Sequence, residues 1–205
     1  MLVVGLTGGI GVGKTTVAGL LAGHGAVVVD CDLLGRTVVE PGGLAHEAVV
    51  ARFGTGVVRD DGSVDRPALA RQVFGHPDAL ADLNAITHPA IDVGIARAIT
   101  AAPVDALVVL DMAVLVETRL GRGQYELVVV VEAPLATRLT RLAARGLGRD
   151  QALARIAAQA SDADRRAVGD LFVDNGGDEA ALAGRVATLW AELRRRAASS
   201  ERYTR

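Results

Sequence analysis

The stretch Gly8-Gly9-Ile10-Gly11-Val12-Gly13-Lys14-Thr15 decides the fold, because it matches every fixed position of the pattern G-x-x-x-x-G-K-[ST]. This pattern is the P-loop, whose backbone N–H groups surround nucleotide phosphates while its lysine reaches the terminal ones. Lys14 is the only lysine among the 205 residues. Lysine is a compact charge on a thin stem, so it fits beside terminal phosphates where the broad arginine fork does not. The sequence therefore predicts a site for nucleotide phosphates.

The residues on either side of this stretch complete the arrangement. Leu2–Leu6 is a short apolar run of the strand type, and Thr15–Leu21 has the pattern of the first turns of a helix. Strand, glycine loop and helix in this order direct backbone N–H groups and a helix N-terminus at an anion. A glycine-rich turn with an incidental lysine is the alternative interpretation, and the complete motif in this setting disfavours it. We expect phosphate binding by the residues Gly11, Val12, Gly13, Lys14, Thr15 and Thr16, with the Thr15 hydroxyl as a ligand of Mg²⁺.

Composition limits the class of protein. Half of the residues are hydrophobic but only 3% are aromatic, so Val, Leu, Ile and Ala must form the core. The net charge of −2 gives no reason to expect a nucleic-acid partner. Cys31 is the one cysteine, which excludes a disulfide within the chain and agrees with a reducing cytoplasm. No apolar run approaches the ~18 residues of a membrane span, and no basic segment precedes the first apolar run. We expect a cytoplasmic protein with no membrane partner.

Two insertions interrupt a series of apolar strands. Four of the strands lack polar alternation, as parallel strands buried on both faces do. The predicted strands are Leu2–Leu6, Ala26–Asp30, Ala106–Asp111, Glu126–Val131 and Leu171–Asp174. About seventy residues separate the second strand from the third, too many for an ordinary connection, so we expect a ligand-holding subdomain there. Apolar residues recur at helical spacing within it, over Val38–Phe53, Arg66–Phe74, Ala79–Ile86 and Pro89–Thr100, with breaks at Pro41-Gly42-Gly43, Asp60-Asp61-Gly62 and His76-Pro77.

The second insertion follows the fourth strand and is rich in arginine. A helix is predicted to begin with Pro134 at its first position and to end before Gly146, and a second helix spans Asp150–Arg166. A final amphipathic helix is predicted over Glu179–Ala197, with a frayed tail from Ser199 onward. The predicted fold is therefore α/β, a P-loop NTPase fold with a five-stranded parallel sheet flanked by helices. Its predicted parts are a core (1–32, 104–135 and 168–205), a helical acceptor-binding insertion (33–103) and a lid insertion (136–167).

Asp30-Cys31-Asp32 closes the second predicted strand, where ligands gather in open α/β sheets. A dinucleotide-binding fold also places an acid there, but the third glycine of its G-x-G-x-x-G pattern would fall at Lys14. A GTPase would need a second lysine for the usual guanine-reading segment, and the chain has none. A helix cap or turn is the ordinary interpretation of such an aspartate. Beside a P-loop, we interpret Asp32 as the group that orients and deprotonates an acceptor hydroxyl.

A small P-loop kinase needs an acceptor-binding insertion, an acid near the acceptor and arginines over the phosphates, and all three are present. Arg141, Arg145 and Arg149 are the candidates for a lid clamp that neutralises the transferring phosphoryl group. Two alternatives stay open at this point. One is a kinase for a nucleoside monophosphate or a shikimate-like alcohol, and the other is a non-catalytic ATP-binding regulator. A panel of acceptors separates them, because a regulator would bind ATP without acceptor-dependent release of ADP.

The chain resembles the dephospho-CoA kinases over almost its whole length. The P-loop alone is shared by many families, whereas the further elements in this order are much more specific. The resembling segments are Gly5–Thr16, Asp30–Arg36 (D-x-D-x-x-x-R) continuing to Gly42, Leu83–Pro89 (L-x-x-[IL]-x-H-P), Arg155–Gln159, Arg165 and Asp170–Gly176. The resemblance implies transfer of the γ-phosphoryl group of ATP to the ribose 3′-hydroxyl of dephospho-CoA, the last step of coenzyme A synthesis.

The resemblance also implies roles for single residues. Asp32 would be the catalytic base, acting with Lys14, while Arg36 and His88 would join Asp32 in holding the acceptor. Asn175 would lie near the adenine of ATP, and Asp111 would lie on the Mg²⁺ side of the site. The family's D-x-P-L-L-x-E segment is here Asp111-Met112-Ala113-Val114-Leu115-Val116-Glu117, with alanine in place of the proline and valine in place of the first leucine. The missing proline would loosen the turn after the third strand.

Overall fold

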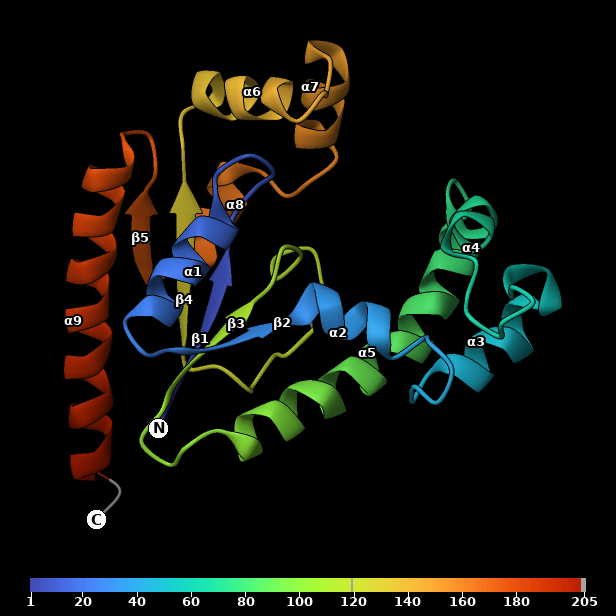
Figure 1. Cartoon of the computed structure of the whole chain (residues 1–205), viewed down its shortest axis with the longest axis horizontal. Helices are drawn as coiled ribbons and strands as arrows, with labels where there is room; N and C mark the ends of the chain where they lie inside the picture. The colour runs from blue at the N-terminus through green and yellow to red at the C-terminus, as the bar shows by residue number, and fades with distance from the viewer. Residues whose placement is uncertain (119, 204–205) are drawn as a thin grey trace. The chain divides into compact units, whose positions relative to one another are not determined.

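The computed structural model describes residues 1–118 and 120–203, and it divides into two compact units (Figure 1). One unit comprises Met1–Asp30 and Ile99–Arg205, and the other comprises Cys31–Ala98. Within the described residues, no helix has both the length and the apolar character that crossing a membrane requires.

The first unit is built on a five-stranded sheet in which every pairing is parallel, as predicted. The strand order is β2-β3-β1-β4-β5, so the strand that leads into the P-loop lies in the middle. The bounds are β1 Leu2–Thr7, β2 Val27–Asp30, β3 Leu107–Asp111, β4 Leu127–Glu132 and β5 Leu171–Asp174. Because the strands are parallel, their carboxyl ends meet at one edge, and ligands bind at that edge in folds of this kind.

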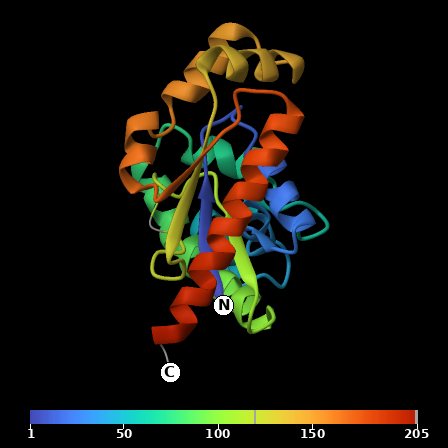
Figure 2. The same cartoon turned by 90° about the vertical axis from the view of Figure 1, so that its left-hand side faces the viewer.

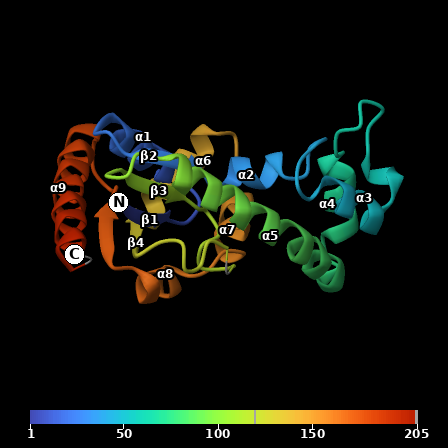
Figure 3. The same ribbon diagram turned by 90° about the horizontal axis from the view of Figure 1, so that it is seen from below.

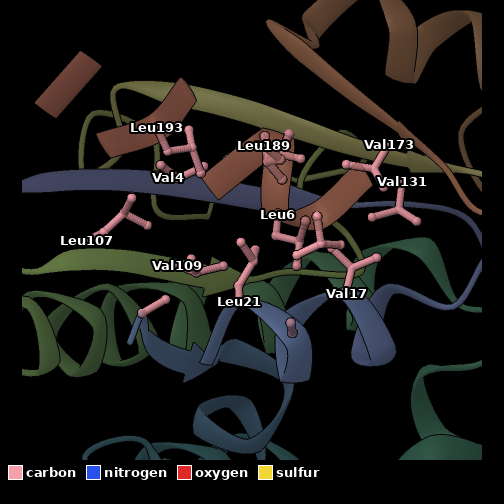
Figure 4. Close-up of a cluster of buried hydrophobic side chains, with 14 of the residues drawn as sticks. Val4, Leu6, Val17, Leu21, Leu107, Val109, Val131, Val173, Leu189 and Leu193 are labelled. Carbon is pink, nitrogen blue, oxygen red and sulfur yellow. The ribbon is translucent and has the colours of Figure 1, made fainter. Parts of the chain in front are cut away.

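The helices of this unit cover both faces of the sheet. Their bounds are α1 Lys14–Gly23, α6 Leu135–Ala144, α7 Arg149–Ala157, α8 Asp162–Val168 and α9 Glu179–Tyr203. Figure 3 shows α1 and α8 on opposite sides of the sheet, and Figure 2 shows α9 running along it, with α6 beyond the far end. Alternate residues of β1, such as Val4 and Leu6, pack in one cluster with side chains of α1 and α9 (Figure 4). Apolar residues of the opposite parity, such as Val3 and Val108, are also buried, which is why these strands show no polar alternation.

Helix boundaries in this unit differ from the prediction in three places. The helix predicted over 150–166 is two helices, because the Ser161 side chain accepts a hydrogen bond from the backbone N–H of Asp164 and starts α8 with a capping box. Hydrogen bonds from Ser161 lower the pKa of the Asp164 carboxyl in return. Pro134 is the N-cap of α6 rather than its first helical residue. The last helix continues past Ala197 to Tyr203, since that segment contains no glycine or proline to end it.

The Cys31–Ala98 unit is helical. Its elements are α2 Cys31–Thr37, α3 His46–Phe53, the 3-10 turn η1 Thr55–Val57, α4 Arg66–Val73 and α5 Pro77–Ala101, the last three residues of α5 belonging to the first unit. Gly94 of α5 lets the Leu34 side chain of α2 approach closely, because a Cβ at Gly94 would lie 3.3 Å from Leu34 Cδ2. Val49, Val57, Val64 and Ile95 are completely buried in this unit.

The break expected at Pro41-Gly42-Gly43 is present: turns precede α3, which begins at His46, and Gly42 adopts a positive φ of 81°. One prediction for this unit was wrong. The two helices predicted on either side of His88 are one helix, α5, with Pro89 inside it. Proline removes one backbone hydrogen bond and disfavours helix at the preceding residue. Burial of Thr87, Ala90 and Ile91 around it offsets that cost.

Candidate functional site

The P-loop connects the carboxyl end of β1 to the first residue of α1, and its shape depends on glycine. Gly11 and Gly13 have φ values of 84° and 89°, which side-chain-bearing residues rarely adopt. A Cβ at Gly9 would lie 3.2 Å from the guanidinium carbon of Arg138, so the loop also needs glycine to let that side chain approach. The backbone can therefore wrap closely around an anion at the start of α1.

A pocket of about 180 Å³ lies inside the loop. Its lining consists of Gly8, Gly9, Ile10, Gly11, Gly13, Lys14, Thr15, Thr16, Ala113, Arg145 and Gln159. The Lys14 ammonium forms an ion pair with the Asp111 carboxylate, and both side chains are largely buried. Asp111 ends β3 and pairs in register with Leu6 of β1, which explains how it comes beside the loop. The structure therefore brings together the predicted lysine and the predicted Mg²⁺-side carboxylate.

A second pocket, of about 340 Å³, adjoins the first. The two share Gly13, Thr16 and Arg145 in their linings, so they are neighbours on the same side of the loop. The other residues of its lining are Arg141, Ala144, Asn175, Gly177, Asp178, Glu179 and Leu182. A small pocket lined by glycine residues of the loop is suited to phosphates, and a larger neighbouring pocket is of a size suited to the rest of a ligand.

Asn175 and Arg141 hold the P-loop from the side of the second pocket. The buried Asn175 amide donates a hydrogen bond of 2.7 Å to the Val12 carbonyl. Arg141 donates to the same carbonyl at 3.1 Å and to the Asn175 side-chain oxygen at 3.2 Å. Arg145 lines both pockets, whereas Arg149 begins α7 and lines neither. Of the three predicted clamp arginines, Arg141 and Arg145 thus line these pockets in this structure.

The sequence analysis missed two further supports of the loop. Arg138 is 3% exposed, and its Nε donates to the Ile10 carbonyl at 2.9 Å while Nη1 pairs with Asp162 at 3.2 Å. The Gln159 side-chain oxygen accepts the Ile10 N–H at 2.7 Å. Arg138 lies beside the apolar positions Leu135, Leu139 and Leu142 in the sequence of α6, and nothing in the sequence distinguishes it from an exposed arginine.

Arg165 is the most deeply buried charge near the site, at 1% exposure. Its guanidinium donates to the Thr7 hydroxyl at 3.2 Å and to the Glu117 carboxylate at 2.6 Å. Glu117 also accepts the backbone N–H of Ala160 at 2.9 Å. The Arg165–Glu117 ion pair thus connects α8 to the segment after β3. The hydrogen bonds of the same two side chains connect α8 to the end of β1 and the segment after β3 to Ala160. That segment is held by Arg165 although Ala113 stands at the position where the family has proline.

We expect Glu117→Ala to lower the free energy of unfolding by about 3 to 5 kcal/mol, because it leaves the Arg165 charge buried without a carboxylate. Glu132→Ala is the matched control, since Glu132 pairs with the next residue, Arg166, whose side chain is 66% exposed. The control is expected to cost much less, because water screens an exposed ion pair. Urea denaturation followed by circular dichroism measures both, and equal losses in the two variants would contradict the role of burial.

The predicted acceptor residues all lie in the Cys31–Ala98 unit. Asp32 and Arg36 are exposed and lie four residues apart on α2, which puts them on one face of that helix. His88 lies within α5 and is half-buried. Asp32 follows the carboxyl end of β2 by two residues along the chain.

The fold and the site define a class. A parallel sheet, a complete P-loop with its lysine, and a helical unit inserted after the second strand are the parts of a P-loop nucleotide-binding protein of the kinase type.

Comparison with known proteins identifies the family within that class. The family model of dephospho-CoA kinase matches residues 2–180. A dephospho-CoA kinase of Frankia casuarinae is 48% identical over 193 residues, covering 94% of this chain and 84% of the relative. A dephospho-CoA kinase of Thermobifida fusca is 47% identical over 197 residues, covering 96% of this chain and 98% of the relative. This chain belongs to the dephospho-CoA kinase family, which confirms the resemblance seen in its motifs.

Solved structures agree on the fold. The crystal structure of TT1252 from Thermus thermophilus has a TM-score of 0.81 at 34% identity, covering 94% of this chain and 97% of that one. A shikimate kinase from Acinetobacter baumannii has a TM-score of 0.52 at 17% identity, covering 92% of this chain and 90% of that one. The second likeness concerns the fold alone, and together the two confirm the predicted P-loop kinase fold.

Proposed function

We propose that this chain transfers the γ-phosphoryl group of ATP to the ribose 3′-hydroxyl of 3′-dephospho-CoA, giving CoA and ADP. The chain is an enzyme, a dephospho-CoA kinase, and phosphorylation of dephospho-CoA is its step in coenzyme A biosynthesis. The observation that carries the assignment is the intact P-loop with Lys14 at its centre, in a chain that aligns with named dephospho-CoA kinases over nearly all of its length. We place the reaction in the cytoplasm.

ATP is the co-substrate, and we assign its phosphates to the pocket inside the P-loop. The backbone N–H groups of Gly11, Val12, Gly13, Lys14, Thr15 and Thr16 would surround them, with the Lys14 ammonium on the β- and γ-phosphates. The nucleoside would occupy the adjoining 340 Å³ pocket beside Asn175. The Asn175 amide is committed to Val12. Asn175 would therefore shape the pocket rather than read the base through that group.

Mg²⁺ fits the oxygen groups beside the loop. Thr15 lines the phosphate pocket, and the Asp111 carboxylate contacts Lys14, which also lines it. Mg²⁺ takes few protein oxygens and completes its shell with water and phosphate, so one hydroxyl and one carboxylate suffice. When bound, the ion would neutralise phosphate charge. Asp111 would then serve both the ion and the lysine, holding the ammonium in place before nucleotide arrives.

The acceptor would bind to the helical unit, assigned to residues 33–103 with Asp32 at its start. The Asp32 carboxylate would accept the proton of the 3′-hydroxyl as that oxygen bonds to the γ-phosphorus. The bond from the γ-phosphorus to the bridging oxygen would break, and ADP would leave. Arg36 and His88 would hold the acceptor.

We assign residues 136–167 to the lid. Arg145 lies at both nucleotide pockets, and Arg141 supports the loop between them. With Arg149 they would neutralise the transferring group and exclude water, so that the phosphoryl group is not hydrolysed.

A panel of acceptors tests the proposed function. ADP release is measured with ATP, Mg²⁺ and either dephospho-CoA, AMP, CMP or shikimate, and the product is identified by mass. We expect release with dephospho-CoA far above that with the other three, and a product with the mass of CoA. A preference for AMP, CMP or shikimate would identify a different small kinase. ATP binding without acceptor-dependent release would indicate a regulator.

A further inference from the structure

Gln159 lies between α7 and α8, and its side chain belongs to the wall of the phosphate pocket. Its side-chain oxygen accepts the Ile10 N–H at 2.7 Å. A backbone N–H can only donate, so the other end of the side chain must be the NH2 group, which carries two N–H donors. That NH2 group forms no hydrogen bond with any of the described residues. Gln159 thus carries, at the phosphate pocket, donors that the protein itself does not use.

The amide of Gln159 is held in place by its surroundings. The backbone N–H of the next residue, Ala160, donates to Glu117 at 2.9 Å, and Glu117 is itself held by an ion pair with a buried arginine. Ile10 is fixed as well, because Arg138 Nε donates to its carbonyl at 2.9 Å. The oxygen and nitrogen of an amide are bonded to one carbon, so these contacts also confine the NH2 group. A donor that is fixed before its ligand arrives loses little entropy on binding.

The place of Gln159 in the pocket selects the terminal phosphate. The residues that this pocket shares with the proposed nucleoside pocket are Gly13, Thr16 and Arg145. Gln159 and Lys14 line the phosphate pocket alone. With the nucleoside in the neighbouring pocket, the phosphate chain passes the shared residues first, and its end lies among the unshared ones. The donors of Gln159 are therefore placed for the γ-phosphate.

We propose that Gln159 is a further catalytic residue, whose side-chain amide donates hydrogen bonds to the γ-phosphoryl group during transfer, an inference that rests on the proposed function. In the transition state, negative charge is spread over the oxygens of that group, and fixed N–H donors stabilise it. The glutamine neither gains nor loses a proton. Because the N–H groups proposed to bind the phosphates begin at Gly11, the Ile10 N–H can keep holding Gln159 while ATP is bound.

A purely structural role for Gln159 leads to a different expectation. In that case only the oxygen that accepts the Ile10 N–H would matter. Glutamate keeps such an oxygen and almost the same size, but its carboxylate has no N–H donor and carries a negative charge. Gln159→Glu therefore separates the two roles, because it preserves the support of the loop and removes the donor.

Single-turnover kinetics measures the contribution of the donor. We expect Gln159→Glu to lower the rate with dephospho-CoA by about a hundredfold or more, the usual effect of removing one fixed donor to a developing anion. Between about pH 8 and about pH 5, the ratio of its rate to that of wild type should rise as the pH falls, because a protonated carboxyl is neutral and can donate. A rate within about threefold of wild type at the upper pH would overturn the proposal.

Gln151→Glu is the matched control. Gln151 is an exposed residue of α7 outside both pocket linings, and the substitution makes the same change of charge. We expect it to keep the wild-type rate at every pH.

Gln159→Met is the second variant, because methionine has a similar length, no donor and no charge. Its loss of rate cannot come from repulsion of phosphate, and we expect it to be at least about tenfold, without recovery at low pH. Thermal melting checks that each variant is folded. A wild-type rate in folded Gln159→Met would overturn the proposal.

Equilibrium titration tests the contact without turnover. We expect Gln159→Glu to weaken binding of a non-hydrolysable ATP analogue by about tenfold or more, while the affinity for ADP, which has no γ-phosphate, stays unchanged. A residue that only supports the loop would affect both nucleotides alike. If wild-type enzyme does not phosphorylate dephospho-CoA, the proposed function fails instead. These titrations then decide the role of Gln159 separately, where equal changes for ADP and the analogue, or none for either, would overturn it.

Discussion

Lys14→Ala is expected to abolish phosphoryl transfer, lowering kcat/KM by at least about a thousandfold. Lys14 is the single lysine of the chain, and it lines the pocket where the phosphates are proposed to bind. Without the Lys14 ammonium, no lysine charge is left to stabilise the negative charge that develops on the γ-phosphoryl group and on the leaving ADP. ADP release with dephospho-CoA, measured in a coupled assay, checks this result.

Lys14→Arg is the matched control for charge. It keeps a cation that can pair with Asp111, so thermal stability should remain close to that of wild type. The broad guanidinium cannot lie where the thin lysine stem does, so activity should stay far below wild type. Lys14→Ala, in contrast, also leaves the buried Asp111 carboxylate without this partner and should melt at a lower temperature. Activity of Lys14→Ala within tenfold of wild type would contradict the assigned role.

Asp32→Asn is expected to lower kcat by about a hundred- to ten-thousandfold while leaving ATP affinity almost unchanged. The amide keeps the size of the side chain and can still hydrogen-bond the acceptor, but it cannot accept the hydroxyl proton. Single-turnover kinetics with dephospho-CoA and equilibrium titration with a non-hydrolysable ATP analogue measure the two effects. The split between them identifies a group that acts in the chemical step rather than in nucleotide binding.

Asp30→Asn is the control for the acidic pair. Asp30 ends β2, whereas Asp32 lies on α2, so the two carboxylates belong to different elements although only one residue separates them. We expect Asp30→Asn to retain most of the activity. Full activity in Asp32→Asn together with a large loss in Asp30→Asn would assign the base to the other aspartate.

Much of the fold could be predicted because its signals are local. The apolar runs that became β1, β3 and β4 are short and continuous, and parallel strands buried on both faces produce that pattern. Helix boundaries were less predictable. Apolar spacing over 150–166 did not reveal the capping box at Ser161, and the proline at position 89 suggested a break that burial of α5 overrides.

The site was predictable to the extent that it lies in motifs. The P-loop residues follow from one pattern, and Asp111 was named through the resemblance of its segment to that of the family. Its contact with Lys14 depends on the pairing of β1 with β3, which only the structure shows. The supports of the loop did not follow. Arg138 and Arg141 lie on one helix, and their sequence positions look like those of ordinary exposed arginines. In the structure, both donate hydrogen bonds to backbone carbonyls of the loop.

The sequence by itself predicted where a nucleotide's phosphates would bind, because a glycine-rich turn and one lysine act through backbone geometry and charge within eight neighbouring residues. It also determined the sheet, through apolar runs whose length and continuity need no distant partner to be recognised. Only the tertiary structure decided which charges are buried and which carbonyls are bonded. Thr7 and Arg165 are 158 residues apart, and Val12 and Asn175 are 163 apart. Contacts of that kind depend on how packed helices bring side chains out of water, which no local pattern encodes.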